Sequence, residues 1–265
     1  PLSLRLYHPV VLDDPHLLAQ DGHAPSEGNP QFHQQMVYAV GMTTIRNFER
    51  ALGRKVLWSS RRLAPARGDA ATGLAEAGAA FSPALVGSVG MGAGQPRSRP
   101  PQEREAFVRR LRIYPHALRE ANAYYSPGKK ALLFGYFPAV GEDVGRNLPG
   151  GMVLTCLSHD IVAHETTHAV LDGMHRHFIE ASNPDVLAFH EAFADLVALV
   201  QRFTMPEVLR WALQRARGDL RRDDTLGRIA RQFGEAIGHR GALREYITDE
   251  PDPSALARTP EPHAR

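Results

Sequence analysis

The chain has 265 residues, of which 43% are hydrophobic, so it is long enough to bury one large core or two modest ones. Its 31 basic and 29 acidic residues leave a formal net charge of +2, which argues against nucleic acid or an anionic membrane as the main partner. No apolar run reaches the roughly 18 residues that a membrane span needs. The single cysteine, Cys156, has no second cysteine for an internal disulfide. Cellular location and oligomeric state stay open.

The first third of the chain is predicted to contain one long helix and one long loop. Apolar residues three to four positions apart predict a helix from Pro30 to Leu52, with Gly53 ending it. Residues 64–100 are rich in Ala, Gly, Pro and Arg without a clear period, and they predict a loop or insertion. A further helix is expected over residues 102–112.

Two β-prone runs within residues 122–137 flank the sequence SPGK (126–129) and predict a hairpin. Proline followed by glycine at its centre fits a type II turn, because glycine accepts a positive φ. The pattern is then mainly helical from about residue 157 to 240. We therefore expect an α+β fold. A mixed region with a small antiparallel sheet would occupy residues 1–157, and a mainly helical lobe, truncated at its C-terminal end, would occupy residues 158–265.

The sequence HETTH holds two histidines separated by one helical turn. Ser158 is a suitable N-cap, so the helix is expected to begin near His159 and to place His164 and His168 on one face. Two imidazoles in this arrangement can chelate one ion, with Zn–N distances of about 2.0–2.1 Å. Glu165 can reach a metal-bound water without being a ligand. The alternative is a polar helix face that happens to carry two histidines.

A second helix is predicted over residues 182–203, with Asn183 as its N-cap. Its core face is expected to consist of Leu187, Phe193, Leu196, Val197 and Val200. Glu191 and Asp195 lie one turn apart on this apolar helix, where an unpaired carboxylate is costly to bury. A metal ion would explain both residues. Glu191 would be the third ligand, and Asp195 would accept a hydrogen bond from the far nitrogen of His164. The alternative is that both carboxylates are simply solvated.

These segments resemble the thermolysin-like neutral zinc metallopeptidases, which are gluzincins. The sequence DIVAHETTHAVLD (160–172) is similar to the family's zinc helix, and HEAFADLVALV (190–200) is similar to its Glu-Ala-x-x-Asp helix. The sequence ANAYY (121–125) looks like the family's edge strand. The resemblance covers about residues 30–58 and 120–250.

The resemblance implies a zinc metalloendopeptidase. Residues 158–265 would then be its helical zinc-binding lobe, and the zinc site would lie in the cleft between this lobe and residues 1–157. One catalytic Zn²⁺ would be bound by His164, His168 and Glu191, which leaves one position for water. The metal would lower the pKa of that water, and Glu165 would accept its proton as general base.

Four further residues take roles from the same resemblance. Asn122 and Ala123 would bind the backbone of an extended peptide or protein substrate. Arg244 would contact the substrate carbonyl, and His263 would stabilise the charge that develops in the transition state. The substrate side-chain preference does not follow from any of these residues.

The chain also departs from the family pattern. Residue 190 is His where the family has Asn, and Ile179 falls where a tyrosine is expected. Arg202 stands in place of a calcium-ligating carboxylate, so a calcium site is doubtful despite Asp160. These departures leave one alternative function open, which is a catalytically inactive zinc-binding module of a larger protein.

Overall fold

A computed structural model describes the backbone of residues 8–58, 61–62, 105–106, 110–140, 148, 150–175, 178, 180, 182–217, 228–229 and 244–245. The side chains of the four two-residue strands in this set are not described. The loop predicted over residues 64–100 lies outside the described residues, and so do Ile179 and His263.

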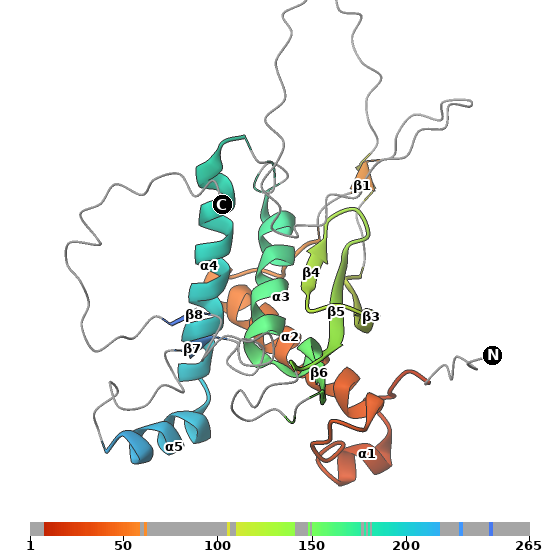
Figure 1. Cartoon of the computed structure of the whole chain (residues 1–265). Helices are drawn as coiled ribbons and strands as arrows, with labels where there is room; N and C mark the ends of the chain where they lie inside the picture. The colour runs from red at the N-terminus through yellow and green to blue at the C-terminus, as the bar shows by residue number, and fades with distance from the viewer. Residues whose placement is uncertain are drawn as a thin grey trace, which may run out of the picture.

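Along the described residues, two helices are followed by six strands, then by a 3₁₀ helix and three α-helices, and finally by two short strands (Figure 1). The helices are α1 (Pro15–Ala19), α2 (Pro30–Leu52), the 3₁₀ helix η1 (Thr155–Leu157), α3 (His159–Met174), α4 (Pro184–Phe203) and α5 (Pro206–Ala216). The strands are β1 (Arg61–Arg62), β2 (Glu105–Ala106), β3 (Arg112–Leu118), β4 (Ala123–Ser126), β5 (Ala131–Pro138), β6 (Met152–Leu154), β7 (Arg228–Ile229) and β8 (Arg244–Glu245). The α+β class is confirmed.

The main sheet is built around β5. Its strand order is β3-β5-β4, and β6 pairs with the far end of β5. β4 and β5 form the predicted hairpin, with Tyr125 opposite Leu132. β3 runs parallel to β5, so the sheet is mixed and not antiparallel throughout. The predicted type II turn is wrong, because the positive φ falls at Lys130 (48°) and not at Gly128.

The predicted helix boundaries agree with the structure where capping residues mark them. The Asn29 side chain caps α2, and Gly53 follows it in the left-handed conformation with φ of 65°. The Asn183 side chain caps α4 as predicted. α3 begins at His159, although the Ser158 side chain makes no capping hydrogen bond.

Two helical predictions are wrong. Within the span 102–112, residues 105–106 form β2 and Arg112 begins β3. Beyond α5, residues 228–229 pair with residues 244–245 as antiparallel strands, so the helical region does not continue to residue 240. In each case a pairing partner distant in sequence decides the structure, and local spacing does not reveal such a partner.

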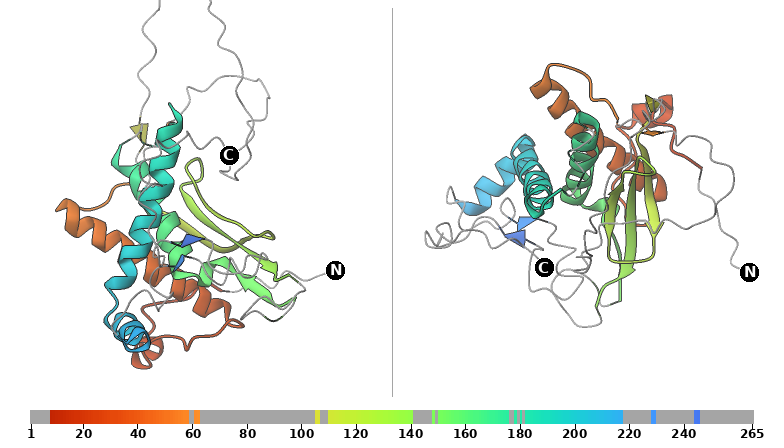
Figure 2. Two further views of the ribbon diagram at one scale, coloured as in Figure 1. Left: turned by 60° about the vertical axis from the view of Figure 1, so that its left-hand side comes forward. Right: turned by 90° about the horizontal axis from the view of Figure 1, so that it is seen from above.

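α3 lies in the middle of the molecule, between the sheet on one side and α4 on the other (Figure 2). The main core includes buried residues from the sheet, from three α-helices and from η1: Val37, Val40, Tyr125, Leu132, Phe134, Cys156, Val162, Ala163, Ala169 and Ala198. This core includes residues on both sides of the boundary expected at residue 157. The division into two regions stays a prediction.

The face of α4 that meets α3 is not the one predicted. Ala194 and Ala198 are fully buried, whereas Leu196 and Val200 are 54% and 51% exposed. Leu187 is also 54% exposed. Small alanine side chains let two helices approach closely, so the large apolar residues of α4 lie on its other sides.

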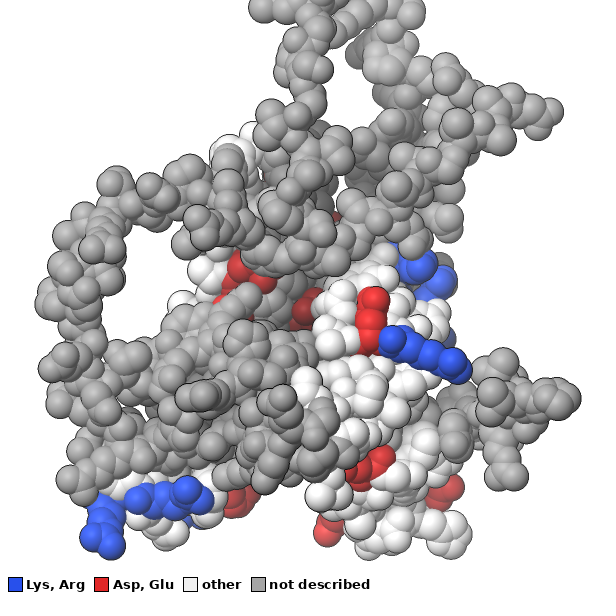
Figure 3. Space-filling model, in the orientation of Figure 1, with Lys and Arg blue, Asp and Glu red and all other residues white. Residues whose placement is uncertain are grey.

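Acidic and basic side chains of the described residues form small separate groups on the face drawn in Figure 3. Among the described helices, none combines the length and hydropathy required of a transmembrane span.

Candidate metal centre

α3 and α4 are antiparallel, and this direction brings the predicted site residues together. His164, early in α3, contacts Asp195, while His168, one turn later, contacts Glu191, one turn earlier in α4. Side chains spaced by four residues on two facing helices therefore meet in successive layers.

His164, His168 and Glu191 converge on one point, and they are called the triad below. The Nε2 atoms of the two histidines are 3.0 Å apart, and each lies 3.4 Å from one carboxylate oxygen of Glu191. In a tetrahedral zinc site with Zn–N of about 2.0–2.1 Å, ligand atoms are about 3.3–3.4 Å apart. Two imidazole nitrogens and one carboxylate at these distances could hold a zinc ion and leave its fourth position open.

The pKa values of His164 and Glu191 in the triad are shifted even without a metal ion. Burial lowers the pKa of His164, but hydrogen bonds to Asp195 and Glu191 and the charge of Glu165 outweigh burial and raise it to about 10. Burial acts to raise the pKa of Glu191, but hydrogen bonds from His164 and His168 hold it well below its ordinary value. A protonated imidazole among carboxylates occupies the place where a metal cation would bind.

Asp195 supports His164 from behind. Its Oδ1 atom lies 2.8 Å from His164 Nδ1, and the carboxylate is buried. A hydrogen bond donated by Nδ1–H fixes the ring so that Nε2 faces the triad. This is the contact that the sequence predicts. Its role in metal binding stays a prediction.

His190 supports His168 in a similar way, which sequence reasoning missed. His190 is buried, and its Nε2 hydrogen-bonds to the Phe178 carbonyl oxygen. Its Nδ1 lies 3.3 Å from His168 Nδ1, and the two rings stack at 5.5 Å. A carbonyl only accepts, so His190 Nε2–H is the donor and His190 Nδ1 accepts a hydrogen bond from His168 Nδ1–H. This leaves His168 Nε2 facing the triad. The only signal in the sequence is the position of His190 directly before Glu191.

Glu165 lies beside the triad and faces the sheet. Its Oε2 atom accepts a hydrogen bond of 2.8 Å from the backbone N–H of Tyr125 in β4. Burial raises the pKa of Glu165, against the opposing effects of His164 and His168. A buried carboxylate with a raised pKa is suited to take up and release a proton near neutral pH.

A buried polar cluster fixes β4 and its turn against α3. Tyr125 Oη donates a 2.6 Å hydrogen bond to Asp172 Oδ2, and Lys130 Nζ donates to the same oxygen at 2.9 Å. Asp172 lies on α3 one turn beyond His168. The cluster therefore keeps the strand that contacts Glu165 in a fixed place along the helix.

The predicted substrate-binding residues are only partly described. Asn122 and Ala123 lie at the start of β4, and the Ala123 N–H donates to the Asn122 side chain at 2.9 Å. The backbone of Arg244 lies in β8, opposite Ile229. Their contacts with a substrate are not tested, and His263 is outside the described residues.

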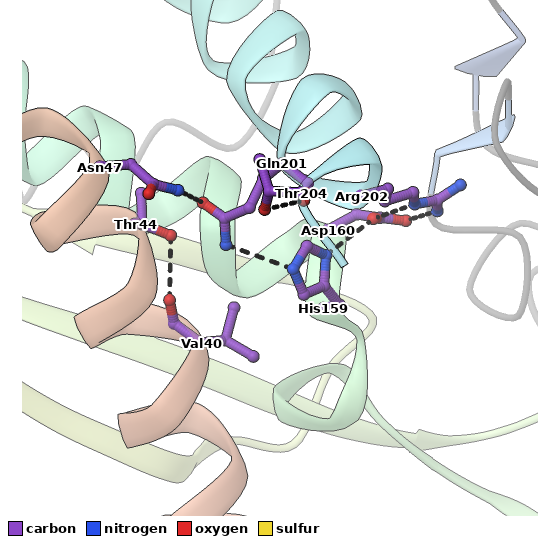
Figure 4. A network of polar contacts seen from close by, with 8 residues as sticks. All are labelled: Val40, Thr44, Asn47, His159, Asp160, Gln201, Arg202 and Thr204. Atoms are coloured by element: carbon purple, nitrogen blue, oxygen red, sulfur yellow. Dashed lines mark hydrogen bonds and ion pairs between the residues drawn. The ribbon is translucent and has the colours of Figure 1, made fainter. Parts of the chain in front are cut away.

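Asp160, the acidic residue considered for calcium, is paired with Arg202 (Figure 4). Arg202 Nε donates to Asp160 Oδ1 at 2.7 Å, and Arg202 Nη2 contacts Oδ2. Gln201 also links α4 to His159 and to Asn47 of α2. A calcium ion at Asp160 would have to displace this guanidinium group.

Comparison of the chain with models of known protein families, with curated proteins and with solved structures finds no match. The proposals below rest on the residues and geometry of this chain.

Proposed function

We propose that the protein is a zinc-dependent peptidase that hydrolyses peptide bonds with Glu165 as general base. One observation carries the proposal. The Nε2 atoms of His164 and His168 lie 3.0 Å apart, each lies 3.4 Å from a different carboxylate oxygen of Glu191, and Glu165 lies beside them without joining the triad. A zinc site that served structure alone would not need this additional carboxylate.

A zinc ion at the triad would lower the pKa of a bound water toward neutrality and polarise a substrate carbonyl. Glu165 would accept the proton of the attacking water and pass it to the leaving amine. Its hydrogen bond to Tyr125 holds the carboxylate between the triad and β4. β4 is the terminal strand in the order β3-β5-β4, so an extended peptide could pair beside it near Ala123.

The test is Glu165→Gln in the zinc-loaded full chain. The amide oxygen can still accept the Tyr125 N–H, so the fold and the bound zinc should be retained. The amide cannot take a proton from water, so cleavage of a generic protein substrate should fall by ~10²–10⁴-fold. Glu207→Gln, at an exposed position on α5, is the matched control and should leave cleavage unchanged.

The alternative function is a catalytically inactive zinc-binding module. The observation in its favour is that Ile179 stands at the position where the family pattern has a tyrosine. Full zinc occupancy without hydrolysis by the wild-type chain would support it. Equal hydrolysis by wild type and Glu165→Gln would remove Glu165 from the mechanism and contradict the peptidase proposal.

A further inference from the structure

A second group of metal-ligating side chains lies where α2, β3 and η1 meet. It consists of His33, His116 and Cys156, and it is called the thiol cluster below. His33 Nδ1 and His116 Nε2 are 2.8 Å apart, and one donor atom from each of the three residues lies within 4.8 Å of the others. His33 and Cys156 are buried, whereas His116 is exposed. The triad uses none of these residues.

An irregularity in the sheet accompanies the position of His116. The register between β3 and β5 shifts between Tyr114 and Leu118, and Pro115 within this stretch has no N–H to donate. Such irregularities change the direction of side chains relative to a regular strand. Here the imidazole of His116 reaches His33 on α2.

The ring of His33 is held in the manner of a metal ligand. Its Nε2 hydrogen-bonds to the Ser26 carbonyl oxygen at 3.2 Å, and Nε2 must be the donor because a carbonyl only accepts. The lone pair of Nδ1 then faces His116. Metal-ligating histidines usually donate their other N–H to a carbonyl or carboxylate in this way. Burial also lowers the pKa of both imidazoles, which favours the neutral form.

We propose that His33, His116 and Cys156 form a second metal site, which binds a borderline-soft divalent ion of the zinc type. Thiolate and imidazole donors are the set that such ions prefer over the oxygen donors of calcium or magnesium. His116 is on the exposed side, so a fourth position there is open to water or to a small ligand. The proposal does not depend on the peptidase function.

Binding requires a small rearrangement of the thiol cluster. Two nitrogens in a tetrahedral zinc site are about 3.3–3.4 Å apart, so His33 Nδ1 and His116 Nε2 must separate by about half an ångström from 2.8 Å. The ion must also displace the thiol proton of Cys156, and the proton that His116 Nε2 shares with His33 must move to His116 Nδ1. The competing explanation is a hydrogen-bonded histidine pair beside a cysteine that only fills space in the core.

Cobalt titration of the full chain separates these explanations. Cys156 is the only cysteine, so a thiolate-to-cobalt charge-transfer band can come only from the thiol cluster. We expect this band to appear and to saturate with one equivalent of cobalt at the cluster. It should persist in His168→Ala, which disables the triad. This outcome would hold even if the peptidase proposal failed.

His116→Ala is the decisive variant. His116 is exposed, so its replacement removes a ligand without opening a cavity in the core. The band should disappear, or the cobalt affinity that its titration gives should fall at least tenfold. The circular dichroism spectrum should stay that of wild type. His16→Ala, which removes an exposed histidine from α1, is the matched control and should keep the band. Cys156→Ala should abolish the band and lower the bound cobalt by one equivalent.

Two results would overturn the proposal. One is the absence of a charge-transfer band in wild type at saturating cobalt. The other is a band of unchanged affinity in His116→Ala, which would show that the thiol binds cobalt without this histidine. X-ray absorption on the zinc-loaded protein adds a direct check, since a sulfur ligand at about 2.3 Å is distinct from nitrogen at about 2.0–2.1 Å.

Discussion

The triad and the thiol cluster differ in how the chain assembles them. The triad takes its residues from α3 and α4, which are consecutive helices, and two of its members are spaced by a single turn. The thiol cluster joins His33 to His116 across 83 positions, and adds Cys156 from a third element. A site whose ligands share one helix leaves a periodic pattern in the sequence. A site assembled by tertiary packing leaves none.

The two sites also differ in the groups that surround the ligands. Asp195 and His190 support the triad, so a divalent ion there would meet the charges of Glu191 and Asp195. A neutral backbone carbonyl supports the thiol cluster, and its one anionic ligand would be the Cys156 thiolate. The triad therefore fits a zinc ion that activates water, and the thiol cluster fits a zinc-type ion bound through sulfur.

The largest expected effect is the loss of zinc from the triad in His168→Ala while the thiol cluster keeps its metal. His168→Ala removes a ligand of the triad, so zinc affinity there should fall by more than ~100-fold, beyond the loss seen for supporting residues. Hydrolysis should disappear with the metal. Zinc retention after dialysis against a chelator, measured together with the cobalt–thiolate band, tests this. Loss of the band as well would show that the two sites are not independent.

A smaller effect is expected for Asp195, which contacts the ligand His164. Asp195→Ala should lower zinc affinity at the triad by ~10–100-fold, because His164 loses the partner that fixes its ring. Asp185→Ala, at an exposed position in the first turn of the same helix, is the matched control. Chelator competition at equal protein concentration measures both. Equal zinc affinity in the two variants would contradict a supporting role for Asp195.

The smallest effect, about tenfold for each pH unit, is the pH dependence of zinc affinity at the triad. In the metal-free protein the pKa of His164 is raised to about 10, so below that pH the ring holds a proton that zinc must displace. Apparent zinc affinity at the triad should therefore rise by about tenfold per pH unit between about pH 6 and 8. Chelator competition in Cys156→Ala, which lacks the thiol, measures the triad alone. A pH-independent affinity would mean that His164 is unprotonated before zinc binds.

Sequence reasoning succeeded where chemistry is local. Gly53 and Asn183 mark helix ends as predicted, and the one-turn spacing of His164 and His168 fixes their common face. The contact of Asp195 with His164 followed from the same periodicity.

Predictions failed where a distant partner decides the structure. Residues 105–106 form β2 and not part of the predicted helix because they pair with β1. Ala194 and Ala198 face α3 because close helix packing favours small residues over the larger Leu196. The support that His190 gives to His168 became visible only when α3 and α4 were placed side by side.

The ion pair between Asp160 and Arg202 joins the first turn of α3 to the last turn of α4, at the end of the helix pair away from Glu191. Both charges belong to the same chain, so the effective concentration of one at the other is set by the fold and not by the surrounding solution. A bound calcium ion in that place would be lost on dilution or chelation. Arg202 cannot be removed in that way, so the alignment of the two helices that carry the triad does not depend on a bound calcium ion at this point.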